Sequence, residues 1–206
     1  MYPPEYIEFL YHFHCDRDYF ECHEILEELW KKDPKEERKQ IWVGLIQIAV
    51  SFYHYRRKNF NGAERMMKNA IRILKNETAS LNKLGLDDEQ LLHILQDTFG
   101  RIQKREPYKS IQLPIFDQNL YEICLTTAKE RGKTFGEPSD ISNVFLIHKH
   151  KTRDRTDIIE ERLKNWHKKS SRRERLTPVL SHHRTYGSVY GGSIKIIDAS
   201  LYNFRE

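Results

Sequence analysis

The chain of 206 residues has a formal net charge of +5, with 12% aromatic and 32% charged residues. This length allows one helical domain with a sizeable core plus an appendage, and the aromatic content excludes a globally disordered chain. The longest apolar run, residues 41–53, is shorter than the roughly 20 residues that span a bilayer, so we expect no membrane segment. Three scattered cysteines without a C-x-x-C pair exclude a disulfide framework. Because the N-terminus also lacks the pattern of a signal peptide, we expect a cytoplasmic protein.

The positive charge is concentrated in one short segment. Residues 148–175 hold 11 Lys/Arg against 5 Asp/Glu, a net charge of +6, whereas residues 1–147 hold 21 against 23, a net charge of −2. The overall basic character is therefore poor grounds for assigning nucleic-acid binding to the main part of the chain.

Helical periodicity and capping residues predict six helices before the basic segment. Pro3 and Pro4 suit the first turn of a helix, Gly85 suits a helix C-cap, and Asp87 with Gln90 suits the start of another helix. The expected ranges are about 4–15, 19–32, 34–58, 63–81, 88–105 and 120–131. Short connections between successive helices predict an all-α fold, a compact multi-helix bundle.

Charge and periodicity also divide the chain into three parts. We expect a helical bundle domain over residues 1–135, a basic arm over 136–175 with one helix at about 157–166, and a tail over 176–206 without an assigned structure. The arm helix packs through an apolar face in one interpretation. In the other, residues 148–175 make weak contacts with nucleic acid or an acidic partner.

The second predicted helix carries an acid on its apolar face. At about 100° per residue, His23, Glu27 and Trp30 fall on the face that is otherwise apolar. The remaining acids of this helix fall on the opposite, solvent side: Glu21, Glu24 and Glu28. Since a carboxylate is rarely buried without a partner, Glu27 indicates a polar cluster in the core.

The third predicted helix carries a matching stripe of small and polar residues in an apolar surrounding: Gly44, Gln47, Ser51 and His54. An unpaired buried polar group costs about 1–3 kcal/mol, so the stripe needs polar partners. We expect Gln47 and His54 to meet His23 and Glu27 between the two helices. Trp30 would cover one side, and Gly44 and Ser51 would leave room for the contact or for a small ligand.

Three interpretations of this cluster remain open. It is a hydrogen-bonded network that fixes helix register, or a ligand or catalytic pocket in which a carboxylate poises a histidine as general base, or a divalent metal site with His23, Glu27 and His54 as ligands. The helix is not the H-E-x-x-H helix of zinc proteases, because the second histidine is missing and Glu24 is expected to point away from His23.

These residues also carry a resemblance to a known family. The segment YFECHEILEELW at residues 19–30, together with GLIQIA at 44–49 and His54, resembles the domain-of-unknown-function family number 309. The H-x-x-x-E-x-x-W signature of that family falls on His23, Glu27 and Trp30. The resemblance implies a compact all-helical bundle in a small cytoplasmic protein, and it names no substrate.

Two classes of function follow from the sequence. The first is a small-ligand or metal-binding module built on the His/Glu/Trp cluster, with a divalent metal ion as its cofactor. The second is an adaptor whose cluster is structural and whose basic arm contacts a partner or nucleic acid. Neither class assigns a catalytic residue.

Overall fold

The computed structural model describes residues 1–149, which are helical apart from loops and one isolated β-bridge between Leu86 and Ile115. The described helices are α1 (Pro4–Tyr11), α2 (Tyr19–Lys32), α3 (Gln40–Arg56), α4 (Phe60–Leu74), α5 (Thr78–Lys83), α6 (Asp88–Gln103), α7 (Gln118–Glu130) and α8 (Val144–Ile147). A π-helical turn, His12–Asp16, and a 3-10 turn, Lys35–Glu37, complete them. The predicted all-α fold is confirmed; the arm helix at 157–166 and the tail at 176–206 lie outside the described residues.

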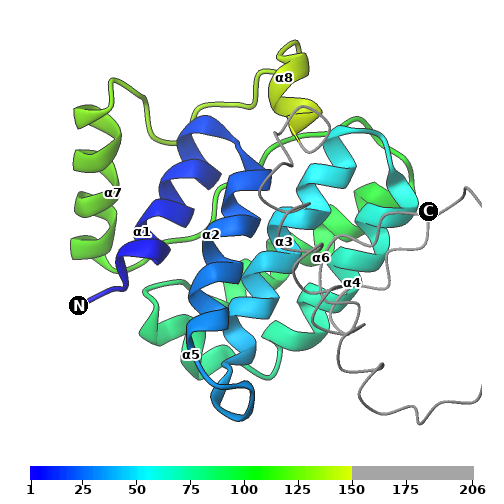
Figure 1. Ribbon diagram of the computed structural model, residues 1–206. Helices are drawn as coiled ribbons and strands as arrows, with labels where there is room; N and C mark the ends of the chain where they lie inside the picture. Colours follow the sequence, from blue (N-terminus) through cyan, green and yellow to red (C-terminus); the bar gives the residue numbers. More distant parts are fainter. Residues whose placement is uncertain (150–206) are drawn as a thin grey trace, which may run out of the picture. The chain divides into compact units, whose positions relative to one another are not determined.

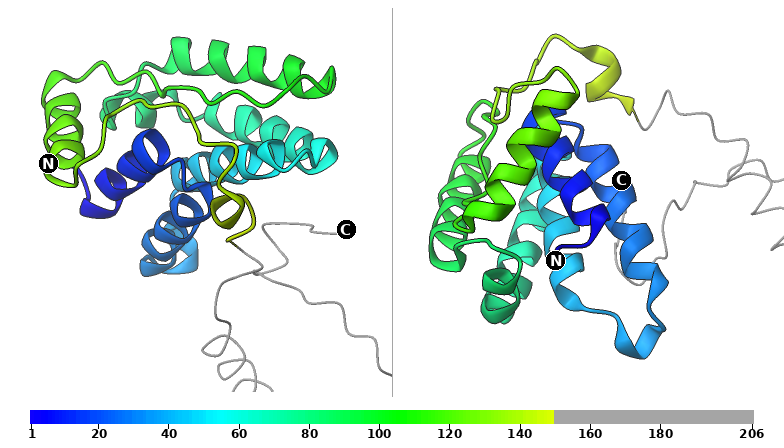
Figure 2. Two further views of the ribbon diagram at one scale, coloured as in Figure 1. Left: turned by 90° about the horizontal axis from the view of Figure 1, so that it is seen from above. Right: turned by 90° about the vertical axis from the view of Figure 1, so that its left-hand side faces the viewer.

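The helices of the first 149 residues pack in the neighbour order α7, α1, α2, α3, α4, α6 (Figures 1 and 2). Every residue of α3 from Ile41 to Arg56 is buried, which confirms its predicted place at the centre of the bundle. Its two main neighbours are α2 and α4. No described helix is long and apolar enough to cross a membrane.

An aromatic core fixes α2 against α3. The ring of Phe52 lies 5.9 Å from that of Phe13 and 5.5 Å from that of Tyr19, with centroids as the reference points. The hydroxyl groups of Tyr19 and Tyr108 lie 2.7 Å apart. Because Tyr19 opens α2, these contacts set the rotation of that helix and hence which of its side chains face the core.

The third helix begins later than predicted. Pro34 starts a 3-10 turn, but Arg38 and Lys39 are extended and α3 begins at Gln40, not near residue 34. The extended residues allow Arg38 to place its guanidinium 4.2 Å from the ring centroid of Trp30, while its Nε donates to the carbonyl of Asp33 at 3.2 Å. This cation–π contact stabilises the extended conformation of the loop between α2 and α3.

The helix predicted over 63–81 is two helices. After α4 ends, the side-chain amide of Asn76 donates to the carbonyl of Arg72 at 3.2 Å, a local bond that competes with helix continuation. The predicted cap at Gly85 is confirmed by its φ of +74°, and a Cβ at this position would lie 2.9 Å from Cβ of Asp117.

Two buried arginines bind the segment after α7 to the bundle. Arg17, 1% exposed, donates to the carbonyls of Phe13, Ile111 and Glu137 at 2.9, 2.7 and 2.7 Å. Arg56, 6% exposed, donates to the carbonyls of Arg17 and Leu146 at 2.7 and 3.2 Å and to the hydroxyl of Ser139 at 3.1 Å. The domain boundary at residue 135 stays a prediction, and these bonds favour a boundary further along the chain.

Candidate functional site

His23, Glu24 and Glu27 form a compact ionic cluster on one turn of α2. Nδ1 of His23 lies 3.2 Å from Oε1 of Glu24, and Nε2 lies 3.1 Å from Oε2 of Glu27. The other oxygen of Glu27 lies 2.6 Å from Nζ of Lys31. His23, Glu24 and Glu27 each offer one ligand atom, and these three atoms lie within 4.8 Å of one another, close enough to share a metal ion. Among residues 1–149 they form the group of His, Cys, Asp or Glu side chains that meets this condition. The charges of Glu24, His23, Glu27 and Lys31 thus alternate in sign.

The helix itself holds the cluster in place. Asp18 caps α2 by accepting a hydrogen bond from the backbone N–H of Glu21 at 3.0 Å. The spacing of four residues then places His23 and Glu27 on one face. Their side chains are 5% and 8% exposed, which confirms the expected burial, whereas that of Lys31 is 51% exposed.

The protonation states of the cluster follow from its contacts. Burial lowers the pKa of His23, but the contacts with Glu24 and Glu27 outweigh burial and raise it to about 9. Burial raises the pKa of Glu27, but His23 and Lys31 outweigh burial and lower it to about 2. The metal-free protein therefore holds an imidazolium beside a carboxylate at neutral pH. The His23 contribution to stability is complete below pH 6.5, the ordinary histidine pKa, and is lost as the pH rises through about 9.

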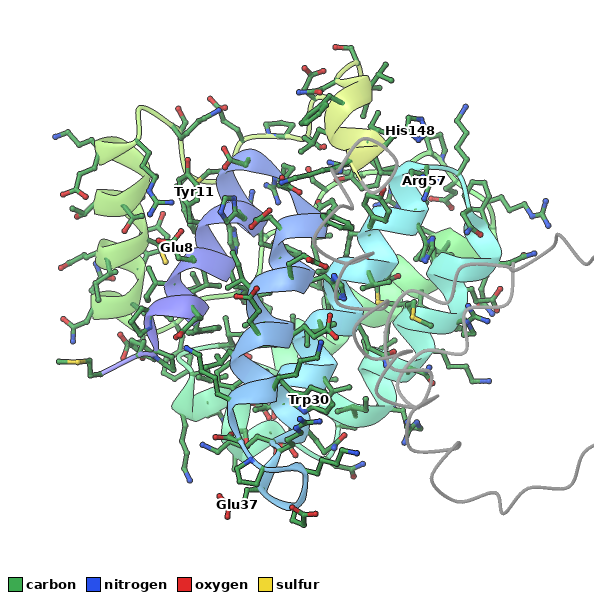
Figure 3. All side chains as sticks on the ribbon, viewed as in Figure 1. Glu8, Tyr11, Trp30, Glu37, Arg57 and His148 are labelled. Atoms are coloured by element: carbon green, nitrogen blue, oxygen red, sulfur yellow. The ribbon has the colours of Figure 1, made fainter. Side chains whose placement is uncertain are left out.

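One aromatic side chain of α2 lies beside the cluster, and another lies further along the helix. The ring of Phe20 lies 6.1 Å from that of His23 and 6.1 Å from that of Tyr53 on α3. Trp30 is buried toward the C-terminal end of α2, near the loop that carries Glu37 (Figure 3). The guanidinium of Arg38 lies over its ring, and the predicted cover of the cluster by Trp30 stays a prediction.

The polar stripe of α3 contacts α4 and the turn that precedes it. The hydroxyl of Ser51 donates to the carbonyl of Ala63 at 2.8 Å. Nδ1 of His54 lies 3.2 Å from the side-chain amide nitrogen of Asn59, the N-cap of α4. A Cβ on Gly44 would lie 2.5 Å from Cδ2 of Leu74 on α4. Small residues in the stripe thus permit close packing of α3 against α4.

The structure therefore brings together only part of the predicted set. His23 and Glu27 are paired, but the group that could hold a metal ion contains Glu24 and not His54. Gln47 is buried, and its Oε1 has no hydrogen-bond partner among the residues described. The physical reason is the position of α3 between two helices, because a stripe on a helix buried all round can face either neighbour.

Two cluster residues were not expected from the helical wheel. Glu24 was predicted to point away from His23, yet its carboxylate contacts Nδ1 while the side chain stays 26% exposed. The wheel gives the direction of Cβ, but a glutamate side chain is long enough to turn back to its neighbour. Lys31 was also missed, although its spacing of four from Glu27 is the signal of a helical ion pair.

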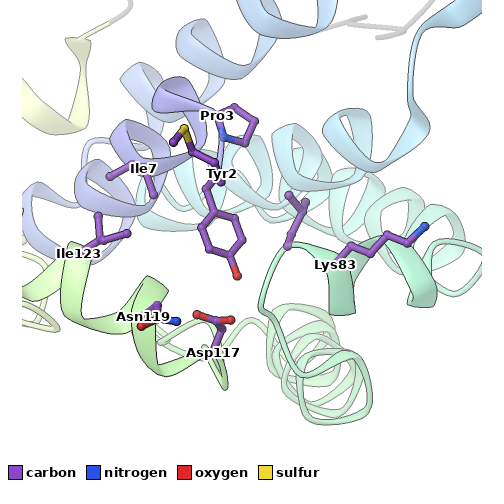
Figure 4. Close-up of a pocket in the computed structure, with 9 residues that line it drawn as sticks. Tyr2, Pro3, Ile7, Lys83, Asp117, Asn119 and Ile123 are labelled. Atoms are coloured by element: carbon purple, nitrogen blue, oxygen red, sulfur yellow. The ribbon is translucent and has the colours of Figure 1, made fainter.

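A cleft among α1, α5 and α7 lies elsewhere in the described residues (Figure 4). It has a volume of about 510 Å³, and no residue of the His23 cluster lines it. The hydroxyl of Tyr2 points toward Asp117 across this cleft (Figure 4), and burial together with that carboxylate raises the pKa of Tyr2. The His23 cluster and this cleft are therefore separate features of the described residues.

Comparison with known proteins places the cluster in a family. Residues 6–66 match the family described as a domain of unknown function, DUF309. Over 174 residues the chain is 51% identical to the "Uncharacterized protein YpuF" of Bacillus subtilis (strain 168). The aligned region covers 84% of this chain and 100% of the relative. The chain belongs to the DUF309 family. No solved structure matches it.

The DUF309 match contains every residue of the cluster and of the α3 stripe. The resemblance inferred from the H-x-x-x-E-x-x-W signature is thereby confirmed. The descriptions of the family and of the relative name neither a ligand nor a reaction, so the function has to be argued from the geometry of the site.

Proposed function

We propose that this DUF309 protein is a cytoplasmic metal-binding module in which His23 and Glu27 of α2 bind a divalent transition metal ion. The separation of 3.1 Å between Nε2 of His23 and Oε2 of Glu27 is the observation that carries the proposal. Two ligand atoms at about 2.1 Å from a tetrahedral zinc ion lie roughly 3.4 Å apart, so a small movement lets one ion contact both.

The donor set suits such an ion. Imidazole nitrogen and carboxylate oxygen are common ligands of zinc and of neighbouring first-row metals. Glu24 supports the same assignment, since a carboxylate on Nδ1 fixes the tautomer that leaves Nε2 for the metal. His23 is an imidazolium at neutral pH, so a metal ion displaces one proton when it binds.

Titration with Zn²⁺ tests this site directly. Wild-type protein freed of metal by EDTA should bind one equivalent of Zn²⁺ in isothermal titration calorimetry. His23→Gln and Glu27→Gln each remove a ligand and should weaken binding more than about 100-fold. Glu24→Gln removes only the partner of Nδ1 and should weaken it about 10- to 100-fold.

His12 offers a matched control, because it also lies between two carboxylates, 4.0 Å from Glu8 and 3.1 Å from Asp16. Among residues 1–149 it belongs to no group that could hold a metal ion, so His12→Gln should bind Zn²⁺ like wild type. The proposal is wrong if wild-type protein binds no Zn²⁺, or if His12→Gln weakens binding as much as His23→Gln.

One observation favours a structural cluster as the second candidate. Every charged side chain of the cluster already has a partner of opposite charge. Glu24 and Glu27 contact His23, and Glu27 also contacts Lys31. In that case Glu27→Gln changes the melting temperature only slightly, because the lost pair is offset by a lower desolvation cost, and no variant changes metal content.

The adaptor function belongs to this second candidate. Lys149, the basic residue of segment 148–175 that the structure describes, already pairs with Asp18 and Glu21 at 2.5 and 2.8 Å. A contact of the other basic residues with nucleic acid stays a prediction. Such binding would weaken steeply between low and physiological salt.

A further inference from the structure

Lys31 occupies the half of the Glu27 carboxylate that His23 leaves free. Its Nζ lies 2.6 Å from Oε1 of Glu27, and the two residues are one helical turn apart. Oε2 of the same carboxylate faces His23 at 3.1 Å. Both oxygens of the proposed metal ligand are therefore held by cations that belong to the protein.

The two cations differ in how freely they can leave. The His23 side chain is 5% exposed and the Glu27 side chain 8%, but that of Lys31 is 51% exposed at the end of α2. A lysine side chain has four methylene groups and a strongly hydrated ammonium group, so it can turn into water at little cost. Glu27 has no such freedom, because the helix and its burial hold it.

An ammonium ion and a divalent metal ion compete for the negative charge of the same carboxylate, even where they contact different oxygens. The ammonium is tethered one turn away, which gives it a high effective concentration at Glu27. A free ion must therefore displace it, or bind to one oxygen while the other remains engaged.

We propose that Lys31 is a built-in competitor that holds Glu27 in the metal-free protein and withdraws into solvent when a divalent cation binds. This inference rests on the proposed function of His23 and Glu27 as metal ligands. It adds a regulatory residue: removal of the charge of this one amine raises the metal affinity of the site.

Zn²⁺ titration of three lysine variants tests the inference. Lys31→Met keeps the aliphatic stem and removes the charge, and it should tighten binding about three- to tenfold, the value of a partly exposed ion pair. Lys31→Arg restores a cation and should reverse most of that gain. Lys32→Met is the matched control, because Lys32 lies on the same turn but pairs with Glu5, and it should change affinity less than about twofold.

The outcomes separate the two proposals. If wild-type protein binds Zn²⁺ through His23 but Lys31→Met is no tighter, or Lys32→Met tightens binding equally, Lys31 is not a specific competitor and the inference fails. If Lys31→Met binds Zn²⁺ through His23 while wild type does not, the proposed function fails for the wild-type protein, and the inference fails as a regulation of that function. If neither protein binds Zn²⁺, the proposed function fails and the inference fails with it.

Discussion

Arg17→Met is expected to lower the free energy of unfolding by about 3–5 kcal/mol, the larger of the stability effects predicted from this structure. The guanidinium of Arg17 donates to the carbonyls of Phe13, Ile111 and Glu137, which come from three separate segments. Methionine fills much of the same volume but leaves these acceptors without a donor. Urea unfolding followed by circular dichroism measures the loss.

Arg101→Met is the matched control. Arg101 also donates to a carbonyl, that of Pro107 at 3.3 Å, and pairs with Glu106 at 3.2 Å, but its side chain is 22% exposed. Water can replace these contacts, so this variant should lose less than about 1 kcal/mol. Equal losses in the two variants would mean that Arg17 does not hold the three segments together.

The helices and the face of α2 were predictable because they depend on local pattern. Periodic apolar residues and the Asp18 cap locate α2, and the spacing of His23 and Glu27 places both on its buried face. Similarly, the long apolar run of α3 predicts a helix buried on all sides. Each of these features is contained within a segment of about 17 residues or fewer.

The partners of buried polar groups were less predictable because they come from distant segments. The stripe of α3 faces α4, and nothing in its spacing chooses between α4 and α2. In the sequence Arg17 looks like an ordinary charged residue at the end of a helix. In the structure it is 1% exposed and has a left-handed backbone conformation with a φ of 55°. Its acceptors, including Glu137, lie far away in the chain, so no local rule indicates its burial.

In the site, too, some contacts were predictable from local spacing and others were not. The pairing of His23 with Glu27 follows from a spacing of four, and so does the pairing of Glu27 with Lys31. The contact of Glu24 with His23 depends on side-chain rotation, which a helical wheel does not contain. The replacement of His54 by Glu24 in the candidate metal group depends on the direction of the α3 stripe.

A second buried histidine predicts a loss of stability in mild acid. His14 is fully buried, its Nδ1 donates to Oε1 of Gln112 at 2.5 Å, and the ring of Phe135 stacks on it at 4.5 Å. The amide of Gln112 in turn donates to the carbonyl of Gly136 at 2.6 Å. Burial, with a smaller contribution from nearby Arg17, lowers the pKa of His14 to about 3, although the hydrogen bond that His14 donates to Gln112 acts in the opposite direction.

The sign of the effect follows from that direction. Folded protein keeps His14 neutral, whereas the unfolded chain takes up a proton below its pKa of 6.5. Stability from His14 is therefore present above pH 6.5 and is lost as the pH falls toward 3, by about 3 kcal/mol at pH 4.5. His14→Gln keeps an N–H donor but cannot titrate, so it should remove most of this loss. His12→Gln, at the partly exposed histidine two residues earlier, should not remove this loss.

Urea unfolding at pH 6.5 and pH 4.5, with EDTA present, measures the difference for each variant. The window ends at pH 4.5 because the stability that Glu27 contributes starts to fall below that value. Since His23 is already protonated throughout this range in the folded state, it adds little to the slope. If wild type and His14→Gln lose the same stability between the two pH values, His14 is not held neutral. The hydrogen-bonded contact of His14 with Gln112 would then be open to water, and Phe135 would not seal it.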